Sequence, residues 1–253
     1  MELDGVTVLV TGARRGIGRA LCERLSREPG VQVLAGVRDV AGFAPLARVE
    51  PVALDLGRPA SIATAWPALE ARGIDVLINN AGQFTAGLLE TQDLGKVYDM
   101  VQVNLTAVID LTHRVLPGML ARARGKIVTN SSVVAYANFP AVTTYAATKG
   151  GASAFAEALR RELAPTPVST LHIVTGGIDT DMLDETKAQL APHFPGTESW
   201  DQHTPAEWAD KIVAAIIADD AVLGPGGKAA LGKLASHLPR QVLDTVVGRA
   251  FQR

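Results

Sequence analysis

Cysteine is almost absent from this chain of 253 residues, in which Cys22 is the single example. One thiol cannot form a disulfide within the chain, which is typical of a protein from a reducing compartment. Cys22 lies close to Ala20, Leu21 and Leu25 in a helical pattern. We therefore expect its side chain to pack in the core rather than to react.

An excess of positive charge is also lacking, because 24 lysine and arginine residues oppose 26 acidic residues and give a net charge of −2. This balance excludes the basic surface typical of nucleic-acid binding and a polybasic patch for a membrane surface. The first residues, MELDGVTVLVTG, have two acids where a signal peptide has basic residues. No run approaches the roughly 18 apolar residues of a membrane span. We expect a cytoplasmic protein that binds a small molecule, with neither nucleic acid nor membrane as a partner.

Hydrophobic residues make up 47% of the chain and charged residues 20%, which suits a large α/β domain with a filled core. We expect residues 1–253 to form a single domain. Apolar, β-branched runs at 6–10, 31–37, 51–56 and 74–78 alternate with helical patterns. This alternation is typical of a parallel sheet with helices between its strands.

The run at 6–10 leads directly into the octapeptide TGARRGIG at 11–18 and then into a helical pattern. Strand, glycine turn and helix follow in the order that a dinucleotide site needs. Gly12 allows the tight turn, Gly16 lets the backbone approach a pyrophosphate, and Gly18 lets the helix pack close to the strand. We predict dinucleotide binding here, with a purely structural turn as the alternative.

The end of the second run indicates which dinucleotide is bound. A site for NAD usually has an acidic residue here for the ribose 2′-hydroxyl, whereas this chain has Val37 followed by Arg38. Arg38 and Arg15 could bind a 2′-phosphate through charge-assisted hydrogen bonds. We therefore predict NADP(H) as the cofactor. The alternative is that both arginines are solvated at loop edges.

Polar residues follow the next two predicted strands as well. Asp55 could accept a hydrogen bond from an adenine amino group, or it could cap the following helix. The segment NNAG at 79–82 offers two amides and a close backbone approach to a bound nucleotide. A turn would use the same residues, so both interpretations stay open.

The segment 94–120 has an amphipathic helical pattern with Asn104 in its apolar middle. A buried asparagine without hydrogen bonds costs about 1–3 kcal/mol, so Asn104 needs a structural or functional partner. His113 has no second histidine at metal-ligand spacing, and we expect it to be structural or exposed. We predict no metal site.

Tyr145 and Lys149 are four residues apart in a run that predicts a helix over 143–163, so their side chains share one face. A neighbouring ammonium favours the phenolate and would lower the tyrosine pKa from its usual value of about 10. Tyr145 could then exchange a proton with a substrate oxygen. Ser131 and Ser132 follow the apolar run KIV, at the expected carboxyl end of a strand, where a hydroxyl could hold the same oxygen.

The chain resembles the short-chain dehydrogenase/reductase family over residues 5–220. The resemblance rests on motifs in the family's order and at its spacing, namely TGARRGIG, NNAG, Asn104, Ser132, Tyr145 and Lys149. It implies one doubly wound Rossmann-type α/β domain with a parallel sheet of seven strands and helices on both faces.

The resemblance also implies a role for each matching residue. Tyr145 would be the proton donor in reduction, Ser132 would orient the carbonyl, and Lys149 would lower the tyrosine pKa and hold the nicotinamide ribose. Asn104 would anchor a water that links Lys149 to solvent, while Ser131 is only a neighbour. The implied cofactor positions are Gly12, Gly16, Ile17 and Gly18 at the pyrophosphate, Asp55 and Leu56 at the adenine, Asn80, Ala81 and Gly82 on the adenosine side, and Ile178 and Thr180 near the nicotinamide carboxamide.

The chain departs from the family pattern at Thr175 and in its tail. A third region, residues 182–203, lies where family members vary. Thr175 stands where the family usually has proline, which would free one turn. The tail 225–253 has two amphipathic pieces instead of a short final strand. Residues 182–203 occupy the place of the variable substrate loop, and their candidates for an apolar pocket are Leu183, Leu190, Phe194 and Trp200.

Two further patterns concern helices. Thr204, Pro205 and Glu207 predict a helix start, as cap, first-turn proline and acidic residue of a capping box. The predicted helix over 143–163 is rich in small residues that permit close helix contact, and we expect a homodimer or homotetramer.

Together these observations predict an NADP(H)-dependent oxidoreductase that transfers a hydride between NADPH and a ketone, an aldehyde or a secondary alcohol. One alternative is an NAD-linked alcohol dehydrogenase. Another is a regulator of the same fold that senses the nucleotide without turnover, although a pure sensor needs no proton donor such as Tyr145.

Overall fold

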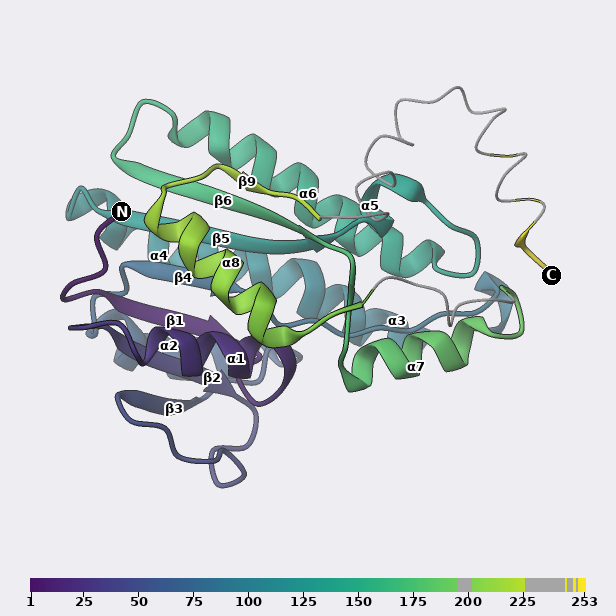
Figure 1. Ribbon diagram of the computed structural model, residues 1–253, viewed down its shortest axis with the longest axis horizontal. Helices are drawn as coiled ribbons and strands as arrows, with labels where there is room; N and C mark the ends of the chain where they lie inside the picture. The colour runs from purple at the N-terminus through teal and green to yellow at the C-terminus, as the bar shows by residue number, and fades with distance from the viewer. Residues whose placement is uncertain (195–201, 226–243, 245–247, 249) are drawn as a thin grey trace.

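The computed structural model describes residues 1–194, 202–225, 244, 248 and 250–253. Its centre is a sheet of seven strands in the order β3-β2-β1-β4-β5-β6-β9, in which every neighbouring pair is parallel (Figure 1). The strands are β1 (Thr7–Thr11), β2 (Gln32–Val37), β3 (Val49–Ala53), β4 (Val76–Asn79), β5 (Gly125–Ser132), β6 (Val168–Thr175) and β9 (Val222–Leu223). The predicted α/β fold with a seven-stranded parallel sheet is therefore confirmed.

Helices connect the strands and cover both faces of the sheet. They are α1 (Gly16–Leu25), α2 (Pro59–Glu70), α3 (Leu94–Val101), α4 (Ala107–Ala121), α5 (Val134–Ala137), α6 (Thr143–Leu163), α7 (Asp181–Leu190) and α8 (Pro205–Ile217). α1 and α8 pack on one face, whereas α2, α4 and α6 pack on the other. Two short strands, β7 (Gly177–Ile178) and β8 (Gln202–His203), form a separate parallel pair.

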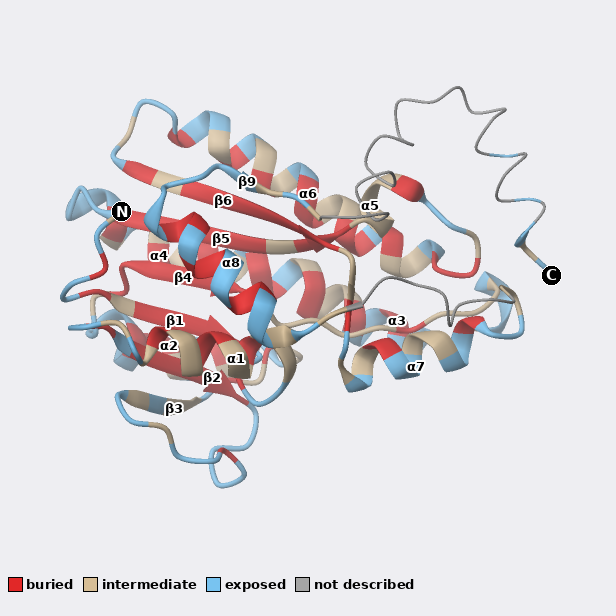
Figure 2. Ribbon diagram, viewed as in Figure 1, coloured by how far each residue is buried: buried red, intermediate tan, exposed pale blue. Residues whose placement is uncertain are grey.

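Successive residues of β1 pack into the two hydrophobic cores on opposite faces of the sheet. Val8 and Val10 pack with α1 and α8, whose Leu21 and Trp208 are buried, while Leu9 packs on the opposite face with Leu111 of α4. A strand covered on both faces needs apolar residues at nearly every position, which explains the continuous apolar runs in the sequence. The central strands are accordingly buried along most of their length (Figure 2).

The first four strands differ from the predicted runs by one to three residues at one or both ends, most of all β3. β3 ends at Ala53 rather than at residue 56, because the chain turns at Asp55, whose Oδ1 accepts a hydrogen bond of 3.1 Å from the Gly57 amide. The N-cap of α2 is Arg58, so the alternative that Asp55 caps this helix is wrong. β9 provides a short final strand ahead of residue 224, so the expected lack of such a strand is also wrong. The two amphipathic pieces predicted within 225–253 lie for the most part outside the described residues.

The predicted helix over 94–120 is interrupted in the structure. α3 and α4 are joined by a π-helical turn, Gln102–Thr106, which contains Asn104. Single π turns of this kind insert one extra residue into a helix and are frequent at functional sites. His113 is exposed on α4, as expected.

The start of α8 confirms the predicted capping box. The Thr204 hydroxyl accepts a hydrogen bond of 3.2 Å from the Glu207 amide, and the Glu207 carboxylate accepts one of 2.9 Å from the Thr204 amide. Pro205 occupies the first helical position, where its missing N–H costs nothing.

Cys22 is fully buried in α1, and burial raises the pKa of its thiol to about 12. The expected core role of this residue is therefore confirmed. Over the residues that the structure describes, we find no helix with both the length and the apolar character needed to cross a bilayer.

Candidate active site

A cavity of about 1000 Å³ opens at the carboxyl ends of the parallel strands. Its walls come from the segments that follow strands β1 to β6, and from α7, which lies beyond the strand ends in Figure 1. This is the edge at which open α/β sheets bind their ligands. The residues predicted for catalysis and cofactor binding line this one cavity, with the exception of Gly18 and Asn104.

Two hydroxyl groups meet at the centre of the cavity. Ser132 is the last residue of β5, and Tyr145 lies in the first turn of α6. The Ser132 hydroxyl acts on the Tyr145 hydroxyl so as to lower its pKa, and the rings of Phe84 and Tyr145 are in T-shaped contact with centroids 4.9 Å apart. Both hydroxyls line the cavity, so a single substrate oxygen could contact the two of them.

Lys149 lies one helical turn after Tyr145, on the same face of α6 as predicted. Its Nζ is 5.9 Å from the centre of the Tyr145 ring and donates a hydrogen bond of 3.0 Å to the carbonyl oxygen of Asn130. Only 5% of Lys149 is exposed, and burial lowers its pKa to about 8. Lys149 therefore keeps its positive charge at neutral pH but loses it in mildly alkaline solution.

The pKa of Tyr145 does not follow the prediction. Burial raises it to about 12, and only the hydrogen bond with Ser132 acts in the opposite direction. The predicted lowering by Lys149 is thus wrong for the protein without ligands, because desolvation of the phenolate dominates and the ammonium is turned toward Asn130. At neutral pH Tyr145 is a phenol, which is the form that can donate a proton.

Asn104 does not line the cavity but forms hydrogen bonds with the segment after β4 and with α6, both of which do. Its side chain accepts a hydrogen bond of 2.8 Å from the Gln83 amide and donates to the Gln83 carbonyl at 2.9 Å and to the Thr148 hydroxyl at 3.2 Å. Thr148 in turn donates to the Tyr145 carbonyl at 2.8 Å. Asn104 therefore ties the segment after β4 to the helix that carries Tyr145, while its implied role toward a water stays a prediction.

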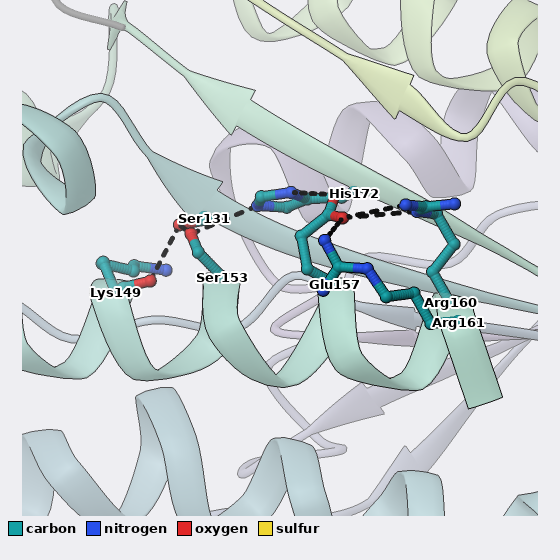
Figure 3. A network of polar contacts seen from close by, with 7 residues as sticks. All are labelled: Ser131, Lys149, Ser153, Glu157, Arg160, Arg161 and His172. Atoms are coloured by element: carbon teal, nitrogen blue, oxygen red, sulfur yellow. Dashed lines mark hydrogen bonds and ion pairs between the residues drawn. The ribbon is translucent and has the colours of Figure 1, made fainter. Parts of the chain in front are cut away.

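A line of polar side chains, most of them buried, extends from Lys149 along α6 (Figure 3). Lys149, Ser153 and Glu157 succeed one another at intervals of four along α6, on the side that faces β5 and β6. The Ser131 hydroxyl donates to the Lys149 carbonyl at 3.0 Å and lies 2.7 Å from the Ser153 hydroxyl. His172 of β6 lies between Ser153, 3.2 Å from its Nε2, and Glu157, 3.8 Å from its Nδ1. The Ser131 hydroxyl thus attaches the end of β5 to the backbone of α6.

The residue that replaces the family's usual proline is fixed in place. The Thr175 hydroxyl donates a hydrogen bond of 2.8 Å to the Ser131 carbonyl, and the Thr175 carbonyl accepts one of 3.0 Å from the Val133 amide. The expectation that Thr175 frees a turn is therefore wrong, because these two bonds attach the end of β6 to the end of β5.

The glycine turn after β1 leaves its backbone open to the cavity. Gly12 and Gly16 have φ angles of +67° and +56°, which side chains rarely adopt, and a Cβ on Gly12 would lie 2.8 Å from the Cα of Ala81. Gly18 does not line the cavity. A Cβ there would lie 2.2 Å from the Gly12 carbonyl oxygen, so Gly18 serves the close packing of α1 on the turn.

Arginines line the end of the cavity near the glycine turn and β2. Arg15 and Arg38 lie there as predicted, and Arg14 is a third. Arg15 Nη1 forms an ion pair of 2.6 Å with Asp181 at the start of α7, and Arg14 lies 3.8 Å from Asp39. Val37 ends β2, and the carboxylate of Asp39 lies two residues beyond it.

The remaining predicted cofactor residues line the same cavity. They are Ile17, Asp55, Leu56, Asn80, Ala81, Gly82, Ile178 and Thr180. Asn80 also has a structural role, since its Nδ2 donates a hydrogen bond of 3.0 Å to the Thr11 carbonyl. Leu183, Leu190 and Phe194 of the predicted substrate loop line the cavity as well, whereas Trp200 lies outside the described residues.

Sequence reasoning missed several lining residues. They include Arg14, Gln83, Phe84, Val134, Phe139, Val142 and Met182. The position of Arg14 beside Arg15 was a usable signal. The apolar residues among them have no recognisable signal in the sequence, because they come from segments far apart in the chain that only the fold brings together.

Comparison with known proteins finds relatives in both sequence and structure. The family model for short chain dehydrogenase matches residues 6–191. The 3-oxoacyl-(acyl-carrier-protein) reductase FabG of Vibrio cholerae is 34% identical over 189 residues, which cover 72% of this chain and 77% of the relative. A short-chain dehydrogenase from Burkholderia cenocepacia, solved in complex with NADP, has a TM-score of 0.83 and 27% identity, over 98% of this chain and 99% of that one. A short-chain dehydrogenase from Streptomyces avermitilis has a TM-score of 0.80 and 26% identity, over 98% of both chains.

Proposed function

The chain belongs to the short-chain dehydrogenase/reductase family, and on this basis we propose that it is an NADPH-dependent reductase of ketones or aldehydes that also oxidises the corresponding alcohols. The observation that carries the proposal is the convergence of Ser132, Tyr145 and Lys149 in one cavity whose opposite end is lined by arginines. A regulator without turnover would need no proton donor such as Tyr145.

The cavity suits a dinucleotide in shape and charge. Its glycine turn presents backbone where a Cβ on Gly12 would collide with Ala81, and α1 begins at Gly16, so the amino end of the helix points at the turn. Gly12, Gly16 and Ile17 would hold the pyrophosphate, and Arg15 and Arg38 the 2′-phosphate. Ile178 and Thr180 would contact the carboxamide at the other end. Bound there, NADPH supplies the hydride that the carbonyl carbon accepts.

The residues around that carbon handle the oxygen and its proton. Ser132 and Tyr145 donate hydrogen bonds to the carbonyl oxygen and orient it. Tyr145 then transfers its proton to this oxygen as negative charge develops there, so the ketone becomes an alcohol and the tyrosine becomes a phenolate. The positive charge of Lys149, beneath the ring, stabilises that phenolate. In alcohol oxidation the same groups work in reverse, with the phenolate as base.

NADP(H) is favoured over NAD(H) by the groups at the end of β2. Val37 provides no carboxylate for a ribose 2′-hydroxyl, while Arg15 and Arg38 line the cavity near it. The second candidate, an NAD-linked alcohol dehydrogenase, is favoured by one observation. Arg15 pairs with Asp181, so part of its charge is already compensated. The relative from Burkholderia cenocepacia, which was solved with NADP, supports the first candidate.

A homodimer or homotetramer is part of the proposal. Tyr98 of α3 is 67% exposed and Ile109 of α4 is 42% exposed, which leaves apolar side chains in water. The small residues of α6 form the wall of a shallow groove lined by Ala146, Ala147, Gly150 and Gly151. A second copy of the chain would cover such surfaces.

The test of the proposed function is the initial rate at which the protein oxidises NADPH and, separately, NADH in the presence of ketones, aldehydes and quinones. The proposal predicts turnover that is faster with NADPH. Equal or faster turnover with NADH would support the NAD-linked candidate. Tight binding of NADPH in calorimetry without turnover of any compound would support the sensor.

A further inference from the structure

Beyond Tyr145 the cavity continues into a region that we call the apolar arm. It is lined by Phe84, Val134, Phe139, Val142, Leu190 and Phe194. Val142 and Leu190 belong to a buried cluster against which Phe84, Val134, Phe194 and Tyr145 pack, while Phe139 is partly exposed at its edge. They come from the segment after β4, from α5, from the segment that joins α5 to α6, and from the end of α7 and the residues that follow it. The arm is therefore a region that several elements build together beside the proton donor.

Aromatic rings give the apolar arm its shape. Phe84 meets Tyr145 edge to face, with an angle of 69° between the rings. Phe139 and Phe194 are also in edge contact, with centroids 6.4 Å apart, and Phe251 near the carboxyl terminus lies 5.5 Å from Phe194. A flat or branched hydrocarbon group can fill such a space and gain both burial and ring contacts.

Among the residues that the structure describes, the charged groups that line the cavity lie outside the apolar arm. The lining arginines in the described part of the chain lie at the glycine turn and at the end of β2, and Lys149 lies beneath the Tyr145 ring. The charges that line the cavity at the start of α7 are carboxylates, Asp179 and Asp181. Among the described lining residues, an anionic group of a substrate in the arm would find no cation to replace the hydration that it loses.

From this distribution we propose that the apolar arm binds the aryl or branched alkyl group of a small, neutral ketone or aldehyde, and that the enzyme discriminates against carbonyl compounds that carry an acidic group there. The inference rests on the proposed function, because the reacting carbonyl must lie at Ser132 and Tyr145. It differs from the substrate in the printed name of the relative from Vibrio cholerae, a 3-oxoacyl group on a carrier protein.

Three ketones of matched shape test the inference: acetophenone, methyl 4-acetylbenzoate and 4-acetylbenzoate. The initial rate of NADPH oxidation gives kcat/KM for each compound. We expect turnover of the two neutral ketones and a kcat/KM for the carboxylate that is at least about 100-fold lower. Equal or faster turnover of the carboxylate would overturn the inference. That result would leave the proposed function intact, because any turnover that Tyr145→Phe abolishes still supports a carbonyl reductase.

A positive charge placed in the arm should weaken the preference for the neutral ketones. Phe194→Lys introduces a cation at a half-buried position, and we expect the ratio of the carboxylate rate to the methyl ester rate to rise at least about tenfold. Phe194→Leu keeps the arm apolar and should retain the wild-type ratio. Ile217→Lys adds the same charge at the exposed end of α8, away from the cavity, and it should leave the ratio unchanged. An equal effect of both lysines would contradict a role of the arm.

Measuring ligand affinity provides a second test of the inference that does not depend on turnover. Calorimetry with the NADP⁺-loaded enzyme gives the affinity for each of the three ketones. Tighter binding of acetophenone and the methyl ester than of the carboxylate supports the inference. Absence of measurable binding for both neutral ketones overturns it, whether or not the enzyme reduces other carbonyl compounds.

Discussion

Arg15 and Asp181 form an ion pair of 2.6 Å across the cavity, although 166 residues separate them in the chain. The pair joins the glycine turn to the first turn of α7. Both side chains are more than 60% exposed, so solvent screens the pair and its net contribution is small, about 0.2–1 kcal/mol. Its interest lies in the competition between Asp181 and a bound phosphate for the same guanidinium.

Removal of the carboxylate should strengthen cofactor binding. Asp181→Asn leaves Arg15 free for the 2′-phosphate, and we expect the KM for NADPH to fall by up to about fivefold, the equivalent of 1 kcal/mol. Steady-state kinetics at saturating carbonyl substrate measure this change. Asp184→Asn removes another carboxylate from the first turn of α7 and serves as the control. A KM that rises in Asp181→Asn alone would show that the pair supports the binding conformation instead.

Arg38 should govern the choice of cofactor. Arg38→Asp replaces the cation at the end of β2 with the acid typical of NAD sites, and kcat/KM for NADPH should fall at least about tenfold while that for NADH rises. Arg27→Asp makes the same charge change at an exposed position outside the cavity. An unchanged ratio of NADPH to NADH in Arg38→Asp would remove this residue from cofactor recognition.

The pH dependence of reduction should reflect Lys149 rather than Tyr145. The pKa of Lys149 is lowered to about 8, so its ammonium is present below this pH and is lost above it. The pKa of Tyr145 is raised to about 12, so the phenol persists through the same range. We expect kcat/KM for reduction to decline as pH rises through about 8, with the slope of one proton. Lys149→Arg keeps its charge, so whatever activity remains should lack this decline.

Thr175 should contribute to stability through its hydroxyl. Thr175→Val preserves the shape but removes the hydrogen bond to the Ser131 carbonyl, which is worth about 1–2 kcal/mol in the free energy of unfolding. Thr175→Ser retains the hydroxyl and should unfold near the wild-type urea concentration. If both variants unfold at the wild-type urea concentration, the hydrogen bond between Thr175 and Ser131 contributes nothing to the free energy of unfolding.

Local sequence patterns predicted those features that depend on neighbours along the chain. The glycine turn, the capping box at Thr204 and the shared face of Tyr145 and Lys149 all follow from short spacings. The strand ends were also accessible, because parallel strands bring Gly12 and Ser132 to the same edge of the sheet. These features defined the place of the site and its catalytic candidates.

The features that were missed depend on tertiary contacts. No spacing relates Arg15 to Asp181 or brings Phe84 to Phe194, since these residues come from segments that only the fold assembles. The direction of the Tyr145 pKa was wrong because spacing predicts proximity to Lys149 but not the desolvation of the phenol. The π-helical turn at Asn104 likewise interrupts a pattern that is regular in the sequence.

The most direct test of the account is a comparison of Tyr145→Phe with the wild-type enzyme in carbonyl reduction with NADPH. The variant keeps the ring against Phe84 and removes the proton that the carbonyl oxygen should receive. We predict that kcat falls by about 10²–10⁴-fold while the affinity for NADPH in calorimetry stays within a few-fold of the wild type. Turnover close to that of the wild type, with the same affinity for NADPH, would contradict the assignment of Tyr145 as the proton donor.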